Sequence, residues 1–362
     1  MRGDLSIAAD TVVSEPIAFA AAYKAVNAQT GRLAIEALDQ VGVLRPGGFA
    51  TAAALLAAVT PQARYLLQSV LRILVEDGEI AADATGFCRR PASMADQDER
   101  TTDPGQTMVT DDPFFRLMNR WREGLADFLA GRRSGIESLF RRGDILDWAA
   151  LHGSSHVMGH YAKIGAALTF AASQEGARVL EIGGGTGAAL RNLLAHGAID
   201  ALGEYCFTDV SPAFFVPLRR DCPRQVVFRT FDFDRPPSAQ GLETAAYDVV
   251  LGVNALHVAR DLPAAVGHVS SLLRPGGRLI LAEGTPAHDG SIWRPDLLFA
   301  MFPGWWNVCL HPELRPRSGF LTLREWERIL GLHHLALDHA SSQKTFRVQW
   351  FGGALTARRT AG

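Results

Sequence analysis

The chain has 362 residues, more than one ordinary domain, and its 48% apolar and 20% charged residues are typical of a globular protein with a substantial core. A net charge of −2 and an isoelectric point near 6.6 supply no basic field for nucleic acid or an anionic membrane. Acidic residues interrupt the N-terminus where a signal peptide has its apolar centre, no apolar run has transmembrane length, and the four cysteines form no CxxC pair. We therefore expect a reduced, cytoplasmic protein that binds neither nucleic acid nor membranes.

Residues 1–92 are predicted to form a helical, winged-helix-like domain. Apolar residues recur at helical spacing in AIEALDQVGVL and again in PQARYLLQSVLRILVEDG. GEIAADATGFCRR then favours two short strands around an Asp-Ala-Thr-Gly turn. The second helix carries few basic side chains, so a lid, or a dimerisation unit that would make a homodimer, is favoured over nucleic-acid binding.

The next two segments connect this domain to the rest of the chain. Residues 93–110 are polar, contain Pro and Gly, and are predicted to be a linker. Residues 111–173 return to helical spacing and are expected to be bridging helices.

Residues 174–362 alternate strands with helices, which predicts an α/β, Rossmann-like parallel sheet with helices on both faces. The predicted strands are RVLEI (178–182), YCFTD (205–209), VVFRTFD (226–232), YDVVLGV (247–253) and RLILAE (278–283). HHLALDHA and KTFRVQWFG are predicted to add a hairpin at one edge. Ligands of such sheets bind beyond the carboxyl ends of the strands.

The strongest chemical signal is VLEIGGGTG, where a strand delivers Glu181 to a glycine-rich turn that opens a helix. Glycine allows a tight turn and close approach to a ligand, so Gly183, Gly185 and Gly187 are predicted to bind a cofactor. The spacing is not GxGxxG, and no GxxxxGK[ST] lysine is present to hold phosphates. Glu181 would repel a pyrophosphate and suits the amine-bearing end of S-adenosylmethionine.

Two further acidic residues are in register with this loop. Asp209 ends the next strand, where a carboxylate can accept hydrogen bonds from both ribose hydroxyls. Asp232 and Phe233 follow the third strand, where the adenine amino group and ring face would lie. Either aspartate alone is more often a turn cap, but together with the glycine loop they predict a cofactor site.

VLEIGGGTG, FTDVSPAFF, NALHVARDL, LLRPGGRLILAEGT and FPGWW occur in the order found in the C-methyltransferase domains of polyketide synthases, which this chain resembles over about 300 of its 362 residues. The resemblance implies a class I, S-adenosylmethionine-dependent methyltransferase, here without flanking synthase modules and therefore similar to a free-standing member. It also implies a His–Glu catalytic dyad, matched by His257 and Glu283. An imidazole can remove a proton from a carbon flanked by carbonyls, and a carboxylate on its other nitrogen would fix the tautomer.

Other residues receive roles from their place in this pattern. Val210 and Asn254 are expected to contact the cofactor, and Tyr161 to contact the cofactor or the substrate, with simple packing as the alternative. The aromatic cluster after Glu283 is expected to wall the acceptor pocket, and it comprises Trp293, Phe302, Trp305 and Trp306.

Two sets of basic residues each admit two interpretations. His152, His156 and His160 recur every four residues and would stack on one helix face, but neighbouring glycines weaken that helix, and no metal site is predicted. Arg315, Arg317, Arg141 and Arg142 are expected to be solvated, with contact to a phosphopantetheine or an acidic carrier as the alternative.

The leading function is C-methylation of an activated β-ketoacyl substrate, either a small molecule or a chain on a carrier protein, in secondary metabolism such as polyketide or antibiotic biosynthesis. The first alternative is a small-molecule O- or N-methyltransferase. The second is an enzyme that binds S-adenosylmethionine but catalyses another reaction, such as cyclisation.

Overall fold

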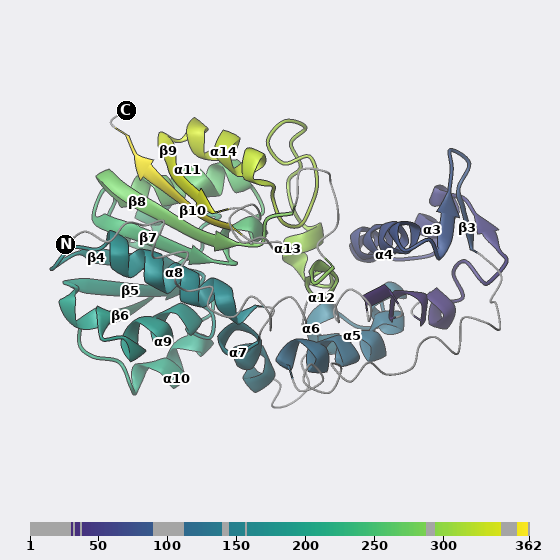
Figure 1. Cartoon of the computed structure of the whole chain (residues 1–362), viewed down its shortest axis with the longest axis horizontal. Helices are drawn as coiled ribbons and strands as arrows, with labels where there is room; N and C mark the ends of the chain where they lie inside the picture. The colour runs from purple at the N-terminus through teal and green to yellow at the C-terminus, as the bar shows by residue number, and fades with distance from the viewer. Residues whose placement is uncertain are drawn as a thin grey trace. The chain divides into compact units, whose positions relative to one another are not determined.

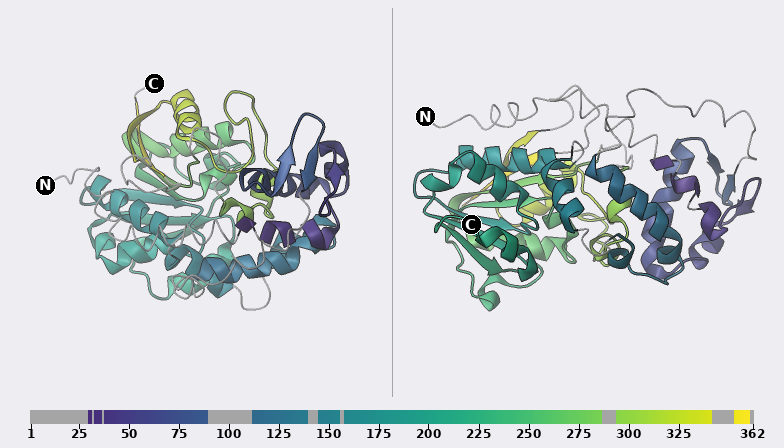
Figure 2. Two further views of the ribbon diagram at one scale, coloured as in Figure 1. Left: turned by 45° about the vertical axis from the view of Figure 1, so that its right-hand side comes forward. Right: turned by 90° about the horizontal axis from the view of Figure 1, so that it is seen from below.

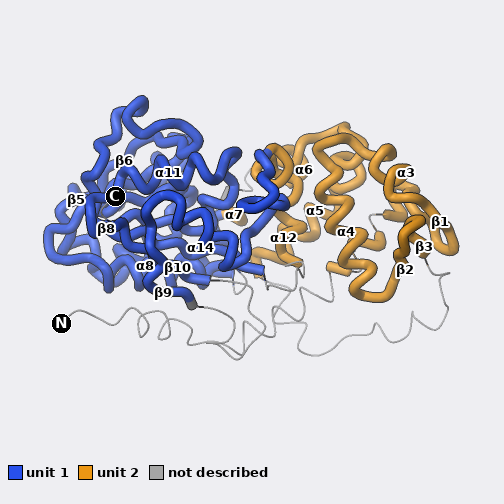
Figure 3. Tube along the Cα trace, turned by 90° about the horizontal axis from the view of Figure 1, so that it is seen from above, with its two compact units in different colours: residues 1–16, 149–291, 308–362 blue, residues 17–148, 292–307 orange. Residues whose placement is uncertain are grey.

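The computed structural model describes residues 30–31, 33–36, 38–89, 112–139, 145–155, 158–286, 294–341 and 353–360. The chain forms two compact units, blue and orange in Figure 3. The first takes its described residues from 149–291 and 308–362, the second from 17–148 and 292–307. Each unit is therefore discontinuous, whereas the sequence pattern suggested consecutive domains. Among the described residues, no helix has both the length and the apolar character needed to cross a membrane.

The second unit contains the winged-helix-like elements that the apolar spacing predicts. They are β1 (Phe49–Ala50), α3 (Ala52–Ala57), α4 (Arg64–Glu76), β2 (Ile80–Ala82) and β3 (Phe87–Arg89), with the strands in the order β1-β3-β2. Asp83 closes the β2–β3 turn because its carboxylate accepts hydrogen bonds from the backbone N–H groups of Thr85 and Gly86. The rest of the unit comprises α5 (Pro113–Leu129), α6 (Gly135–Leu139), α12 (Asp296–Phe299) and α13 (Pro303–Trp306), while α7 (Ile145–Gly153) spans the division between the units.

The first unit is built on a seven-stranded sheet (Figure 1). Its strands are β4 (Arg178–Ile182), β5 (Glu204–Asp209), β6 (Val226–Thr230), β7 (Tyr247–Val253), β8 (Leu273–Glu283), β9 (Leu335–Ser341) and β10 (Gly353–Arg359). They lie in the order β6-β5-β4-β7-β8-β10-β9, parallel from β6 to β8, with β10 antiparallel to both β8 and β9. The order reverses beside β4, which is the point where open α/β sheets bind ligands. This confirms the predicted Rossmann-like fold.

Helices cover both faces of this sheet (Figure 2). The helices are α8 (Gly159–Ala172), α9 (Ala188–Ala195), α10 (Phe215–Arg219), α11 (Leu262–Leu272) and α14 (Leu323–Leu332). α8 packs on β7 and β8, and α11 and α14 share a core with Leu180, Val250 and Leu281. These three residues alternate along their strands with the ones that face α8, so the two helix layers bury opposite faces.

Two predicted boundaries differ from the structure. The edge hairpin is present, but its second described strand is Gly353–Arg359, whereas KTFRVQWFG lies outside the described residues. α8, expected among the bridging helices, packs directly on the sheet. Gly165 allows this approach, because a Cβ there would lie 2.9 Å from Val253 Cγ2 and 3.2 Å from Leu251 Cδ1.

We predict that Gly165→Leu lowers the free energy of unfolding by about 2 kcal/mol, because overpacking forces α8 away from β7. The matched control is Gly331→Leu in α14, where an added Cβ meets nothing within 4 Å. Replacing a helical glycine at an open site should be neutral or stabilising by up to about 1 kcal/mol. Denaturant unfolding measures both, and equal effects at the two sites would show that α8 does not pack as closely as described.

Candidate active site

Glu181, Asp209 and Glu283 lie at the carboxyl ends of parallel strands, and His257 follows another such strand. β4 ends at Ile182, β5 at Asp209, β7 at Val253 and β8 at Glu283. Because parallel strands deliver their carboxyl ends to the same edge, the loops that follow them are neighbours.

The glycine loop after β4 is shaped by close contacts on both sides. Gly183, Gly185 and Gly187 have φ values of 58°, 54° and 80°, in the left-handed region that favours glycine. A Cβ on Gly183 would lie 2.7 Å from the Cβ of Ala255, in the loop after β7, and a Cβ on Gly187 would meet Leu218. The loop that is predicted to hold the cofactor therefore packs directly against the segment that carries His257.

Asp209 fixes the glycine loop from the neighbouring strand. Its carboxylate accepts hydrogen bonds from Gly185 N and Ser211 N, both at 2.9 Å. A carboxylate has about four acceptor sites, so two contacts leave capacity for ribose hydroxyls. Burial is the main cause of the raised pKa of Asp209. Val210, directly after it, is 61% exposed at the same edge.

Glu181 is a buried acid whose side chain contacts Tyr205. The sequence pattern did not single out Tyr205. The Tyr205 hydroxyl donates to Glu181 Oε2 at 2.7 Å, and the Glu181 side chain is 2% exposed. Burial, opposed by this hydrogen bond, raises the pKa of Glu181 to about 8. No ion pair of the described residues involves Glu181. A cationic ligand group beside it would favour its charged form, which fits the amine-bearing end of S-adenosylmethionine.

The loop after β6 links the predicted adenine site to the segment after β7. The Asp232 carboxylate accepts from Asp234 N, and Phe233 lies beside Gly183, whose added Cβ would be 3.8 Å from its ring. Asp234 in turn accepts from the backbone N–H groups of Arg260 and Asp261. Asp234 was missed by sequence reasoning, although it belongs to the same FDFD run.

His257 and Glu283 form a buried pair. The distance from His257 Nδ1 to Glu283 Oε2 is 2.6 Å, and the two residues are 1% and 0% exposed. Glu283 Oε1 accepts from Ala255 N at 3.1 Å and from Leu256 N at 3.0 Å. Glu283 thus holds both the imidazole and the backbone turn that precedes it.

Asn254 has a buried polar atom without a hydrogen-bond partner among the described residues. Its φ of 45° places it in the left-handed region, and its Oδ1 accepts from Gly284 N at 3.0 Å. Its Nδ2 is buried and has no hydrogen-bond partner within the described parts of the chain. A buried amide donor without an acceptor is costly, so a ligand oxygen at this position would complete the site. Together with the Glu181 carboxyl, this donor fits a ligand that carries both an amine and a carboxylate.

None of the aromatic residues predicted to line the acceptor pocket is a described residue of the first unit. Trp293 lies outside the described residues, and Phe302, Trp305 and Trp306 belong to the second unit. There Trp305 Nε1 donates to the buried Asp296, and Phe302 packs edge-on against Trp148 with ring centroids 5.5 Å apart. A substrate role for these aromatic residues therefore stays a prediction.

The histidine stripe does not lie on one helix. α7 ends at Gly153 and α8 begins at Gly159, so His152 and His160 belong to different helices, and His156 lies outside the described residues. Burial lowers the pKa of His152 to about 4 and that of His160 to about 3. Tyr161 is fully buried with its ring against His160.

Arg315 is the largest departure from the expectation of solvated arginines. Its side chain is 0% exposed, and its guanidinium donates to the carbonyl oxygens of His257 and Ala259. Arg317, two residues later, is part-exposed and pairs with Glu325. The sequence spacing could not predict that Arg315 is buried and Arg317 part-exposed, because burial depends on the fold of the whole loop.

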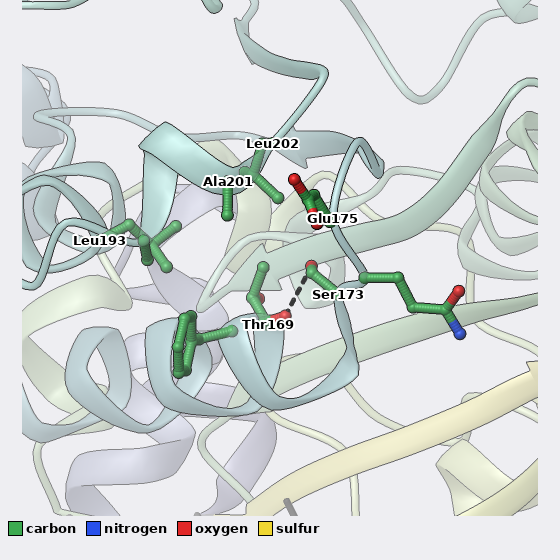
Figure 4. A pocket seen from close by; sticks show the side chains of 9 residues that line it. Thr169, Ser173, Glu175, Leu193, Ala201 and Leu202 are labelled. Carbon is green, nitrogen blue, oxygen red and sulfur yellow. Dashed lines mark hydrogen bonds between the residues drawn. The ribbon is translucent and has the colours of Figure 1, made fainter. Parts of the chain in front are cut away.

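A small pocket lies elsewhere on the first unit, between α8, α9 and the turn before β5 (Figure 4). Thr169, Ser173, Glu175, Ala201 and Leu202 are among the residues that line it. Residues 175 and 202 precede β4 and β5, so this pocket is at the amino ends of the strands and is not part of the site described above.

Comparison with known proteins assigns this architecture. Residues 180–279 match the family described as a methyltransferase domain. The chain is 30% identical over 321 residues to the polyketide synthase ThaQ of Burkholderia thailandensis, across 81% of this chain and 15% of that protein. The chain thus spans about a seventh of the length of this curated relative.

Two solved structures share the fold across nearly the whole chain. The CurJ carbon methyltransferase superposes with a TM-score of 0.80 at 24% identity, covering 99% of this chain and 97% of that one. The trans-methyltransferase CalH, solved in complex with SAH, gives a TM-score of 0.67 at 20% identity, covering 94% and 92%. The prediction of a methyltransferase domain is confirmed over residues 180–279, and the two superpositions confirm the predicted fold.

We predict that Asp209→Ala weakens binding of S-adenosylhomocysteine about tenfold or more, since it removes a charged acceptor and releases Gly185 N. Isothermal calorimetry measures the affinity. Asp200→Ala, an exposed aspartate before β5 at the opposite edge of the sheet, should bind like the wild type. Undiminished affinity of Asp209→Ala would mean that the ribose is held elsewhere.

A second prediction follows from the pKa of about 8 at Glu181. In the unfolded chain this carboxyl titrates near 4.5, so its contribution to stability is present below that pH and is lost as the pH rises through about 8. Relative to wild type, Glu181→Gln should therefore gain at least about 1.4 kcal/mol of unfolding free energy between about pH 5 and about pH 9. Urea unfolding of the ligand-free protein measures this.

The matched control is Glu175→Gln, which replaces an exposed glutamate and should keep the wild-type pH dependence. If the stability difference between Glu181→Gln and wild type does not vary with pH, Glu181 is not a buried acid of raised pKa.

Proposed function

We propose that this chain, a member of the methyltransferase domain family, uses S-adenosylmethionine to methylate the carbon between the two carbonyls of a β-ketoacyl thioester, with His257 as the base. The observation that carries the proposal is the buried 2.6 Å contact between His257 Nδ1 and Glu283 Oε2 at the carboxyl ends of β7 and β8.

The hydrogen bonds of Glu283 support one tautomer of the histidine. An ionised carboxylate only accepts, so Nδ1 of His257 carries the hydrogen of the 2.6 Å contact. The lone pair of the neutral imidazole is then on Nε2, which can take a proton. Once Nε2 is protonated, the carboxylate lies against the imidazolium and stabilises its charge. The N–H groups of Ala255 and Leu256 hold the other carboxylate oxygen, so Glu283 does not rotate away from the histidine.

Several of the residues predicted to bind the cofactor lie at the same edge as His257 and Glu283. Glu181 and Asn254 suit its amine and carboxylate, and Asp209 suits its ribose. The cofactor supplies a methyl group bound to a positive sulfur, which a carbon nucleophile can attack directly. The chain's own task is to place this methyl group and to generate the nucleophile beside it.

The low exposure of His257 supports a carbon acid as the substrate. The imidazole is 1% exposed and its ring lies against Phe320, with centroids 4.3 Å apart, so little water reaches it. A hydrogen between two carbonyls is acidic enough for an imidazole to remove, and the enolate is protected from reprotonation in a dry site. The acceptor has to displace covering side chains to reach Nε2.

The similarity to part of a polyketide synthase supports a thioester as the acceptor. The relative's name states a polyketide synthase, whose growing chains are acyl thioesters. We therefore infer an acyl group on a carrier protein or on its pantetheine, rather than the free acid.

The test is incubation with S-adenosylmethionine and a β-ketoacyl pantetheine, followed by mass spectrometry and NMR of the product. We expect a methyl group on the carbon between the carbonyls, and no transfer to an analogue that already bears two methyl groups there. His257→Ala should lower turnover by roughly 10²–10⁴ with cofactor affinity unchanged. His196→Ala, an exposed histidine at the end of α9, is the control and should retain turnover.

Three outcomes contradict the proposal. One is methylation of a small hydroxylated or amino compound at oxygen or nitrogen while the thioester stays inert, which indicates an O- or N-methyltransferase. Another is release of methylthioadenosine without any acceptor, which indicates cyclisation of the cofactor. The third is near-normal turnover of His257→Ala, which removes the base.

A further inference from the structure

Arg315 is buried beneath the segment that carries the histidine, and its two terminal nitrogens contact different carbonyls of that segment. Nη2 donates to His257 O at 2.7 Å and Nη1 donates to Ala259 O at 2.5 Å, while the whole residue is 0% exposed. The backbone of Arg315 is itself fixed by paired hydrogen bonds with His311, each 2.9 Å long.

We propose that Arg315 is a positioning residue. It holds the backbone of His257–Ala259 in the position at which the imidazole of His257 contacts Glu283. The inference rests on the proposed function, in which this imidazole is the base. Arg315 acts through the backbone of His257 and not on the substrate.

The surrounding contacts explain why this backbone needs such support. Leu256–Val258 is a single 3-10 turn between β7 and α11, too short to be rigid by itself. Glu283 holds its first residues through the N–H groups of Ala255 and Leu256, but these contacts do not reach the carbonyl of His257. Arg315 provides the contact on the carbonyl side of the turn.

The same loop, residues 308–322, contributes two other contacts to this segment. Cys309 N donates to Arg260 O at 2.7 Å, and the Phe320 ring lies against the imidazole of His257. Asp234 holds Arg260 N from the opposite direction. Arg315 is thus the cationic member of a set of contacts that holds the segment from His257 to Arg260.

An arginine suits this task better than a lysine does. The guanidinium is a planar fork that can donate to two acceptors at once, whereas an ammonium on a flexible stem acts as a single point charge. Arg315→Lys therefore keeps the charge but cannot hold both carbonyls in the same geometry. Arg317→Lys is the matched control, because Arg317 lies on the same loop and its guanidinium pairs with Glu325.

The experiment uses full-length protein labelled with 15N-histidine and free of ligand. The Nδ1–H proton of His257, buried and bonded to a carboxylate, should give a far-downfield signal, assigned by its loss in His257→Gln. We expect this signal to move or broaden in Arg315→Lys and in Arg315→Gln, and to stay in place in Arg317→Lys. This readout does not depend on methyl transfer, so it stands even where the proposed substrate fails.

Kinetics provide the second readout. With an active substrate, Arg315→Lys should lower kcat about 10- to 100-fold while KM and cofactor affinity stay within about threefold, and Arg317→Lys should match the wild type. An unchanged His257 signal in both Arg315 variants would overturn the proposal. So would a loss of folding in both variants, judged by circular dichroism, since Arg315 would then be required for the fold itself.

Discussion

The Glu283 carboxylate is the constraint around which the edge of this sheet is arranged. It lies at the end of β8, between β7 and β10, where no part of the residue is exposed. A buried carboxylate is unfavourable unless donors surround it, and three converge here, from His257 Nδ1, Ala255 N and Leu256 N. To supply them, the chain has to turn back immediately after β7. The left-handed backbone of Asn254 makes that turn, and its side chain ties the turn to Gly284 N.

The same turn connects His257, the proposed base, to the glycine loop that is predicted to hold the cofactor. Ala255 packs against Gly183 so closely that no side chain fits there, and Gly185 is held by Asp209 from the next strand. A side chain added at Gly183 would therefore displace Ala255 and the turn that carries His257. In the proposed function, this packing would bring a cofactor in the glycine loop and the base His257 to the same edge of the sheet.

Most of this arrangement follows from local sequence. Five strands, the glycine loop and the two members of the dyad are marked by alternation, by turn residues and by family motifs that are continuous in the chain. Arg315 and Tyr205 could not be assigned in this way. The partners of Arg315 are two backbone carbonyls, which any residues would supply. The Tyr205–Glu181 contact joins adjacent strands, and nothing in the sequence marks it. The aromatic residues after β8 belong to the second unit, because the chain leaves the first unit between residues 292 and 307, so their expected place near the acceptor stays a prediction.

In the proposed mechanism, the imidazole of His257, bound to Glu283, removes a proton from carbon. The most direct measurement is the exchange of deuterium from the carbon between the carbonyls of a β-ketoacyl pantetheine, with S-adenosylhomocysteine bound so that no methyl group can be transferred. We expect wild-type protein to release deuterium to water well above the uncatalysed rate and His257→Ala not to do so. Equal exchange by the two proteins would contradict the proposed mechanism, because the proton would then leave without His257.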